Sequence, residues 1–519
     1  MRLQMASTIT TLYYEACEEF ECSFTGLSPG ASAGTSTPVS DTSRTLRPEW
    51  PAGVVNGRDG GYHIRVSAVT TTYARRLGLF SATMAVIGGI IGSGIFATPN
   101  VVAQRVGSGS LALAAWVLGG LVALAGAFCY AELAERMPRA GGQYVYLRDA
   151  IGPLPAFLYG WALLLVMATG AAAFVAVTFA NYTISLLGLA AGAKLPLAIG
   201  AIVVVCAINY VGVTPGAITQ NVFTLLKLGA LVTLIVAGLL LPVHPTGADT
   251  AVRHAPLVVP SGGLAVTVAL GAALVPVLFT YGGWQQTNFV AEEIVDAERT
   301  LPRALVLGVL AVIAVYLLAN VAYLVVLGPE RLAASVAPAA EAMERVIGPA
   351  GRVVISAGIA VSSFGFLDLV VLVTPRVFQA MAADGVFFPG LARLHPRFRT
   401  PGAAIVVMGA WSAALTLTGT YGKLLDYVVF GDWIFFGSTV ATLFIYRARE
   451  QSRAGGAPET RVRVPGYPWT PAFFVLAALY VVASSVGANP KNAAIGTGLL
   501  LLGVPVFWFW RRQPPMPVP

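Results

Sequence analysis

The sequence has few charged residues, few histidines and few cysteines, and these shortages exclude whole classes of protein. Only 11% of its 519 residues are Asp, Glu, Lys or Arg, whereas a typical soluble domain has about 25%. The chain is therefore not a soluble globular protein. With 56% hydrophobic residues and a mean hydropathy of +0.75, it has room for about a dozen spanning helices of roughly 20 residues each. The composition indicates a polytopic membrane protein.

Catalytic and nucleic-acid-binding patterns are also missing. None of the four histidines lies in an apolar segment or near a cysteine along the chain, so no metal cluster and no nucleophile with a base is apparent. The net charge of +8 comes from scattered arginines, and no basic block is interleaved with aromatic residues. The cysteines have no metal-ligand spacing, and no disulfide is assigned. The sequence predicts no enzymatic activity, no cofactor, no metal site and no nucleic-acid partner. The residues concerned are His63, His244, His254 and His395, and Cys17, Cys22, Cys129 and Cys206.

Residues 1–75 differ in composition from the rest of the chain. They are rich in Ser, Thr, Gly and Pro, carry an acidic patch at residues 15–19 and contain no apolar core of a signal peptide. A segment of this kind cannot bury enough apolar surface to fold. We interpret it as a disordered tail, and a start codon placed too far upstream is the alternative.

Twelve apolar segments follow this tail. They lie at approximately residues 79–104, 110–135, 155–186, 195–212, 216–241, 264–291, 302–328, 351–383, 402–420, 423–446, 469–487 and 492–510. Since a helix of about 20 apolar residues crosses a bilayer, the predicted fold class is an all-α polytopic membrane protein with twelve transmembrane helices.

Lys and Arg residues set the direction of these spans. With the N-terminus in the cytoplasm, eighteen cations fall on the cytoplasmic side and eight on the outer side. Because cytoplasmic loops carry the excess of Lys and Arg, both termini are expected in the cytoplasm. We expect a multi-pass protein of the plasma membrane.

The first and sixth spans are each interrupted by glycines in mid-run. The interruptions are GGIIGSGIF at residues 88–96 and FTYGGW at residues 279–284. They are five helices apart, and because five is odd the corresponding helices of two repeats run in opposite directions, as in transporters with inverted repeats and broken helices. The predicted repeats cover residues 76–241 and 264–446, with two more helices at 467–510. The alternative is that the glycines only allow close helix packing.

A broken helix pair offers a site for a zwitterion. Backbone amides around Gly92, Ser93, Gly94 and Ile95 begin a helix and are predicted to hold a carboxylate. Carbonyl groups around Phe279, Thr280 and Tyr281 end a helix and are predicted to accept from an ammonium group. Glycine suits such a break because a Cβ would obstruct both the backbone and the ligand. A channel would not explain two breaks that each match one half of a zwitterion.

Three ionisable residues lie inside predicted spans: Lys227, Asp368 and Asp432. Such residues are costly in a bilayer and are functional candidates. For Lys227 the alternative is snorkelling to an interface. For the two aspartates the alternative is a structural ion pair or a helix cap.

Five motifs resemble one family. They are GSGIF at 92–96, CYAEL at 129–133, GGQYVY at 141–146, FTYGGW at 279–284 and NFVAEE at 288–293. In this order, and over residues 77 to 446, the chain resembles the amino acid, polyamine and organocation superfamily, and within it most closely the L-type amino acid transporter branch. The resemblance implies a leucine-transporter-like fold of five plus five inverted helices with two extra, sodium-independent transport and frequently obligatory exchange.

The resemblance also implies roles for single residues. The substrate carboxylate falls on Ser93, Gly94 and Ile95, and the amine on Ile90 together with Phe279. Phe279 also matches an aromatic gate. Lys227 matches a lysine that replaces a sodium ion, and Trp433 matches an aromatic residue near the side-chain pocket. The full predicted substrate site is Ile90, Gly92, Ser93, Gly94, Ile95, Phe279, Thr280, Tyr281, Gly282 and Trp433.

The chain departs from the branch in three places. Residues 188–195 contain no cysteine, so the disulfide-linked heavy chain of the animal members is not expected, and a stand-alone carrier of prokaryotic type is implied. Asp368 and Asp432 stand where the branch often has asparagine. Gln285 and Gln286 replace the residues usual after the tryptophan.

The expected partners are an amino acid substrate and the lipid bilayer. A proton-coupled carrier of cationic amino acids or polyamines is the alternative, with Asp368 and Asp432 as coupling or selectivity residues.

Overall fold

Helices and the breaks between them make up the part of the chain that the structure describes. The computed structural model describes residues 72–244, 257, 260–419, 421–452 and 460–511, with the backbone alone at 421–430, 488 and 511. Within these residues the one β feature is a parallel bridge between Leu77 and Ile294. The predicted all-α class is confirmed for the described residues. The predicted tail lies outside them as far as residue 71.

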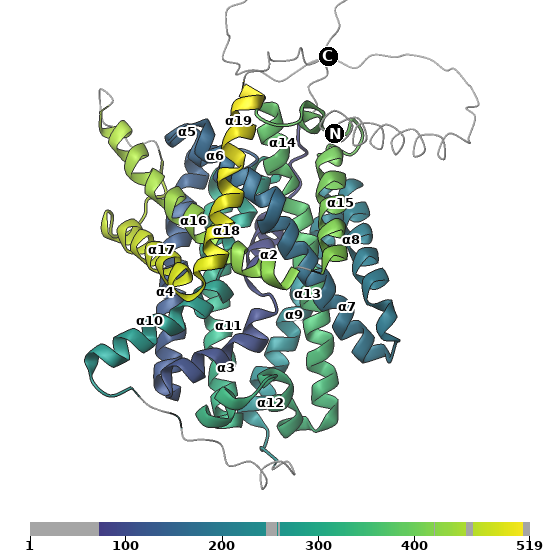
Figure 1. Ribbon diagram of the computed structural model, residues 1–519, viewed down its shortest axis with the longest axis vertical. Helices are drawn as coiled ribbons and strands as arrows, with labels where there is room; N and C mark the ends of the chain where they lie inside the picture. Colours follow the sequence, from purple (N-terminus) through teal and green to yellow (C-terminus); the bar gives the residue numbers. More distant parts are fainter. Residues whose placement is uncertain (1–71, 245–256, 258–259, 420, 453–459, 512–519) are drawn as a thin grey trace, which may run out of the picture. The chain divides into compact units, whose positions relative to one another are not determined.

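The helices follow the order of the predicted spans (Figure 1). The first half has α2 (Leu79–Ile90), α3 (Gly94–Val106), α4 (Gly109–Arg136), α5 (Gln143–Ala150), α6 (Pro153–Ala162), η1 (Leu163–Met167), α7 (Ala168–Leu187), η2 (Ala191–Ala193), α8 (Lys194–Tyr210) and α9 (Val213–Leu240). The second half has α10 (Gly263–Thr280), η4 (Trp284–Glu293), α11 (Ala297–Ala334), α12 (Pro338–Ile347), α13 (Pro349–Val373), α14 (Pro375–Ala383), η5 (Pro389–Ala392), α15 (Gly402–Thr418), α16 (Tyr421–Gln451), α17 (Trp469–Ala488), α18 (Pro490–Leu501) and α19 (Gly503–Arg511).

Each predicted span coincides with one helix or with helices joined at a break. By length and composition, nine helices among the described residues can cross a membrane, and the bent pair α2 and α3 makes a tenth. Helix α15, with 17 residues, is shorter than these. The total of twelve spans and the inverted repeat therefore stay predictions.

Small residues bring the central helices together. A Cβ on Gly358 of α13 would lie 2.7 Å from the Cβ of Ala230 on α9, and a Cβ on Gly308 of α11 would lie 2.5 Å from the side chain of Val86 on α2. Helices in lipid associate through close packing of this kind. Figure 1 shows the result: α2 lies near the middle of the bundle, and both α9 and α11 contact it.

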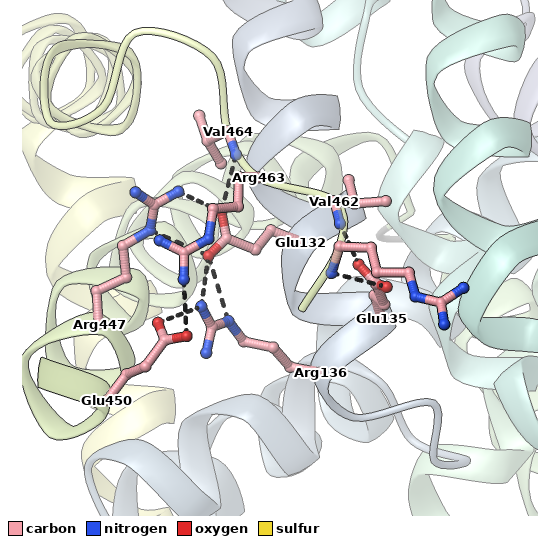
Figure 2. A network of polar contacts seen from close by, with 9 residues as sticks. Glu132, Glu135, Arg136, Arg447, Glu450, Val462, Arg463 and Val464 are labelled. Carbon is pink, nitrogen blue, oxygen red and sulfur yellow. Dashed lines mark hydrogen bonds and ion pairs between the residues drawn. The ribbon is translucent and has the colours of Figure 1, made fainter. Parts of the chain in front are cut away.

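A buried group of charges joins α4 to the C-terminal part of the chain. This Glu132 cluster consists of Glu132 and Arg136 of α4, Arg447 and Glu450 of α16, and Arg463 (Figure 2). Glu132 is fully buried, and it accepts from Arg447 at 2.6 Å, from Arg136 at 2.7 Å and from the backbone N–H of Val464 at 2.8 Å. The cluster therefore holds residues 463 and 464, which precede α17, against the end of α4.

Loss of Glu132 is expected to destabilise the protein strongly. Removing one partner of a buried ion pair leaves an uncompensated charge and costs about 3–5 kcal/mol. Glu132→Ala takes away the carboxylate that pairs with Arg447, whereas Arg136 keeps Glu450. The matched control is Glu135→Ala, because among the described residues Glu135 accepts from the backbone N–H groups of Arg461 and Val462 and from no guanidinium group. Thermal unfolding of both purified variants in detergent checks this. Equal melting temperatures for the two variants would contradict it.

Candidate functional site

A cavity of about 290 Å³ lies where the two interrupted helices meet. We call residues 91–93 the first break and residues 281–283 the second break. Residues of both breaks line the cavity, and α7, α13 and α16 complete its wall. Eight of the predicted substrate-site residues line it: Ile90, Gly92, Ser93, Gly94, Phe279, Thr280, Gly282 and Trp433. Ile95 and Tyr281 do not, because their side chains are buried among neighbouring helices.

The first break separates α2 from α3, which are bent by 43° relative to each other. Helix α2 ends at Ile90, and α3 begins at Gly94. The first amides of a helix have no helical acceptor because no turn precedes them. At the start of α3 these amides belong to residues whose backbone borders the cavity, and a Cβ on Gly92 would meet no atom within 4 Å. The break therefore presents unobstructed N–H groups to a ligand.

The second break ends α10 at Thr280 and leads into the 3₁₀ helix η4. The carbonyl oxygen of Phe279 accepts from the amides of Gly282, at 3.1 Å, and of Tyr281. The last carbonyl groups of a helix have no helical donor because no turn follows them, and α10 ends at the second break. The side chain of Phe279 is 37% exposed and lines the cavity, which is compatible with the predicted gate.

Glycine is required where the two breaks cross. A Cβ on Gly89 would lie 2.7 Å from the carbonyl oxygen of Gly283, and a Cβ on Gly283 would lie 2.1 Å from that of Gly89. Gly283 also has a φ of +105°, which L side chains rarely adopt. The backbones of α2 and of the second break thus touch directly. The start of α3 lies beside the end of α10, because a Cβ on Gly94 would lie 3.1 Å from the side chain of Thr280.

Tyr316 of α11 connects the two breaks. Its hydroxyl lies 3.0 Å from the carbonyl oxygen of Ile90 and 3.3 Å from that of Thr280. Tyr323, two turns along the same helix, donates to the carbonyl oxygen of Ile95 at 3.2 Å. Sequence reasoning missed both tyrosines. The available signal was a row of polar groups, Tyr316, Asn320 and Tyr323, within an apolar run at helical spacing.

Lys227 of α9 is fully buried and reaches the first break. Its ammonium group donates to the carbonyl oxygens of Gly88 at 3.0 Å and Ile91 at 2.9 Å. Ser362 of α13 donates to the same Ile91 oxygen at 3.3 Å. Snorkelling of Lys227 to an interface is therefore excluded, and its charge is used inside the protein to hold the end of α2.

The two buried aspartates have different surroundings. Asp432 of α16 lines the cavity beside Trp433, whose ring packs against Phe474 at a centroid distance of 5.8 Å. Asp368 of α13 is fully buried, does not line the cavity, and accepts from the amide of Asn209 on α8 at 2.8 Å. The sequence left both as coupling or selectivity candidates, and the structure places only Asp432 within reach of a ligand.

A second buried ion pair joins α14 to η4, close to the residues that precede α2. Arg376 of α14 donates to Glu293 of η4 at 2.9 and 3.1 Å, and both side chains are buried. The backbone N–H groups of Arg76 and Leu77 donate to the carbonyl oxygen of Glu293. These contacts therefore hold α14, η4 and the residues before α2 together.

Comparison with known proteins gives matches along nearly the whole chain. A sequence model described as "Amino acid permease" matches residues 77–510. The human "Large neutral amino acids transporter small subunit 2" is 31% identical over 455 residues, which cover 85% of this chain and 82% of the relative. The mouse "b(0,+)-type amino acid transporter 1" is 29% identical, and the match covers 85% of this chain and 88% of the relative. The "Cystine/glutamate transporter" of Pongo abelii is 30% identical, and the match covers 85% of this chain and 86% of the relative.

Proposed function

The chain belongs to the amino acid permease family, and from this premise we propose that it is a sodium-independent secondary transporter that exchanges amino acids across the plasma membrane. Its relatives are amino acid transporters and not enzymes. One observation carries the proposal: the amide end of one broken helix and the carbonyl end of another border the same cavity. An α-amino acid carries the two opposite charges that these ends complement.

In the proposed mechanism the substrate binds between the breaks. Its carboxylate accepts from the amides at the start of α3, around Ser93 and Gly94, and its ammonium group donates to carbonyl oxygens at the end of α10, around Phe279. The substrate side chain extends toward Trp433. Access alternates as the broken helices move together, with the Phe279 side chain as a gate on one side and the Arg376–Glu293 pair closing the other. Both termini lie in the cytoplasm.

Sodium independence follows from Lys227. Its ammonium group already supplies a positive charge to the carbonyl oxygens of Gly88 and Ile91, and such oxygens are ligands that a sodium ion would otherwise use. No disulfide-linked heavy chain is proposed, because residues 188–195 contain no cysteine.

A cationic substrate is the second candidate, and Asp432 favours it. Asp432 lines the cavity, and within the described residues no cation pairs with it. An unpaired carboxylate at a ligand site favours a positively charged group. Lysine, arginine or a polyamine would supply one.

The experiment is counter-exchange by the purified protein in liposomes. We expect labelled amino acid to enter only when the liposomes contain unlabelled amino acid, and to enter equally fast in sodium and in choline buffer. A strict sodium requirement would refute the role of Lys227. Preference for lysine or putrescine over leucine would select the second candidate, and ionic conductance without exchange would indicate a channel.

A further inference from the structure

Asp368 occupies a buried region rich in acceptors and poor in donors. One of its carboxylate oxygens, Oδ1, accepts from Asn209, while the other, Oδ2, is buried and has no donor among the described residues. The Oδ1 atom of Asn209 is also buried without a donor. Asn209 uses both amide hydrogens, one on Asp368 and one on the carbonyl oxygen of Val205 at 3.0 Å.

The alignment of α9 with α13 adds a third such oxygen. Gly358 faces Ala230, Gly365 lies beside Lys227, and Leu372 lies beside Gly216. The two helices are therefore antiparallel, and in this register position 368 is level with position 220. Gln220 is buried, its amide nitrogen donates to Thr224 at 3.1 Å, and its Oε1 has no donor. Asp368 is thus bonded to one amide group and level with another, and the oxygens of both amides lack a donor.

Lys227 reaches Gly365, less than one helical turn from Asp368, yet the two side chains form no ion pair in the described structure. The lysine points instead to the carbonyl oxygens of Gly88 and Ile91. Several other titratable groups on the helices packed against α13 have partners of their own. Arg376 pairs with Glu293, Glu292 accepts from the amide of Ala140, Glu341 and Glu344 lie against Arg331 and Arg352, Cys206 lies toward Ile405, and Tyr210 packs against His395. These helices also carry Lys194 on α8, Tyr182 on α7 and Arg345 on α12.

We propose that Asp368 is a proton-binding site, occupied in the arrangement seen here. An ionised carboxylate that is buried without a cation is strongly disfavoured, whereas a protonated carboxyl group is neutral and can donate. A proton on Oδ2 turns this atom from an acceptor without a donor into a hydrogen-bond donor in a region rich in acceptors. Because a protonated Asp368 is neutral, it needs no cation as a partner, and Lys227 can stay bonded to the first break.

Movement of the first break would release this proton. When α2 leaves Lys227, the ammonium group loses its two carbonyl acceptors and is free to turn toward Asp368. The O–H bond of Asp368 then breaks, the proton passes to water, and the carboxylate pairs with the lysine. The coupling rests on the proposed transport function, since it links the proton to the movement that carries substrate. The protonation of Asp368 in the arrangement seen here does not rest on that function.

Infrared spectroscopy tests the proton site without transport. At pH 7 we expect the wild-type protein in detergent to show a carbonyl stretching band of a protonated carboxyl group that Asp368→Asn lacks. The matched control Asp384→Asn should retain the band, because Asp384 is a partly exposed carboxylate bound to Arg148 and Tyr144. Asp368→Ser serves the same purpose if the asparagine variant does not fold. Persistence of the full band in folded Asp368 variants would overturn the proposal.

Liposomes test the coupling. An inward gradient of one pH unit is a tenfold difference in proton activity, and we expect it to raise the initial rate of wild-type uptake by up to about tenfold. In Asp368→Asn that stimulation should vanish while slower exchange persists. Undiminished stimulation in this variant, or stimulation by a sodium gradient instead, would overturn the coupling. If the protein exchanges nothing, the proposed function fails, and the infrared result still decides whether Asp368 binds a proton.

Discussion

Liposomes that contain Gly92→Leu protein are expected to take up no labelled amino acid, although the variant should fold. Gly92 lies in the first break and lines the cavity, and a Cβ at this position meets no atom within 4 Å. Its φ is not in the left-handed region, so leucine is compatible with the backbone. The added side chain would extend into a cavity of about 290 Å³, at the place proposed for the substrate carboxylate.

Substrate-dependent thermal stabilisation measures this effect directly. We expect binding to weaken by at least about 100-fold, which corresponds to about 2.7 kcal/mol. The matched control is Gly200→Leu, because Gly200 is exposed on α8 and a Cβ there also meets nothing within 4 Å. Normal binding by Gly92→Leu would show that the carboxylate site lies elsewhere.

Gly94→Val, which the sequence alone suggests, is expected to abolish binding as well, but it is a less specific test. A Cβ on Gly94 would lie 3.1 Å from both the methyl carbon and the hydroxyl oxygen of Thr280. Valine would therefore displace α3 from α10 in addition to crowding the substrate. The sequence does not tell what a side chain at Gly92 or at Gly94 would meet, and the structure was needed to separate the two positions.

Replacement of Lys227 by methionine is expected to slow exchange by at least about tenfold. Methionine has a similar length but donates no hydrogen bond, so the carbonyl oxygens of Gly88 and Ile91 would lose donors that lie 3.0 and 2.9 Å away. Hydrogen bonds from charged groups contribute about 1.5–3 kcal/mol each. Without them the end of α2 would no longer be held against α9, and the arrangement of the first break that binds substrate would become less populated.

Initial rates of counter-exchange at saturating substrate check this prediction, with melting temperatures measured in parallel. Thr233→Val is the matched control, because Thr233 lies on the same helix but is exposed and donates to the carbonyl oxygen of Gly229 within that helix. Wild-type rates in Lys227→Met would show that the buried charge only supports packing.

The positions of the two breaks could be predicted from the sequence, and the structure places them at residues 91–93 and 281–283. Glycine clusters in a long apolar run are a local signal, and backbone freedom is a local property. The roles of Tyr316 and Ser362 could not be predicted. Their contacts with Ile90 and Ile91 connect residues that are more than two hundred positions apart in the chain, and no local pattern records such a pairing.

The partners of Lys227 and Asp368 could not be predicted from the sequence either. Their presence inside apolar spans identified them as candidates, and an ion pair between them was one of the open interpretations. The structure instead bonds Lys227 to the first break and Asp368 to Asn209. Which partner a buried charge takes depends on the register of α9 against α13, and this register follows from small residues such as Gly358 and Gly365 at their interface.

The sequence by itself determined that this protein is an all-helical membrane protein with two interrupted helices, because hydropathy and glycine content act over stretches of about twenty residues. Only the tertiary structure decided which backbone ends share a cavity, which aspartate borders it and which buried oxygens lack a donor. Those outcomes depend on distances between helices that are remote in sequence, and a hydrogen bond or ion pair is lost when such a distance changes by about one ångström.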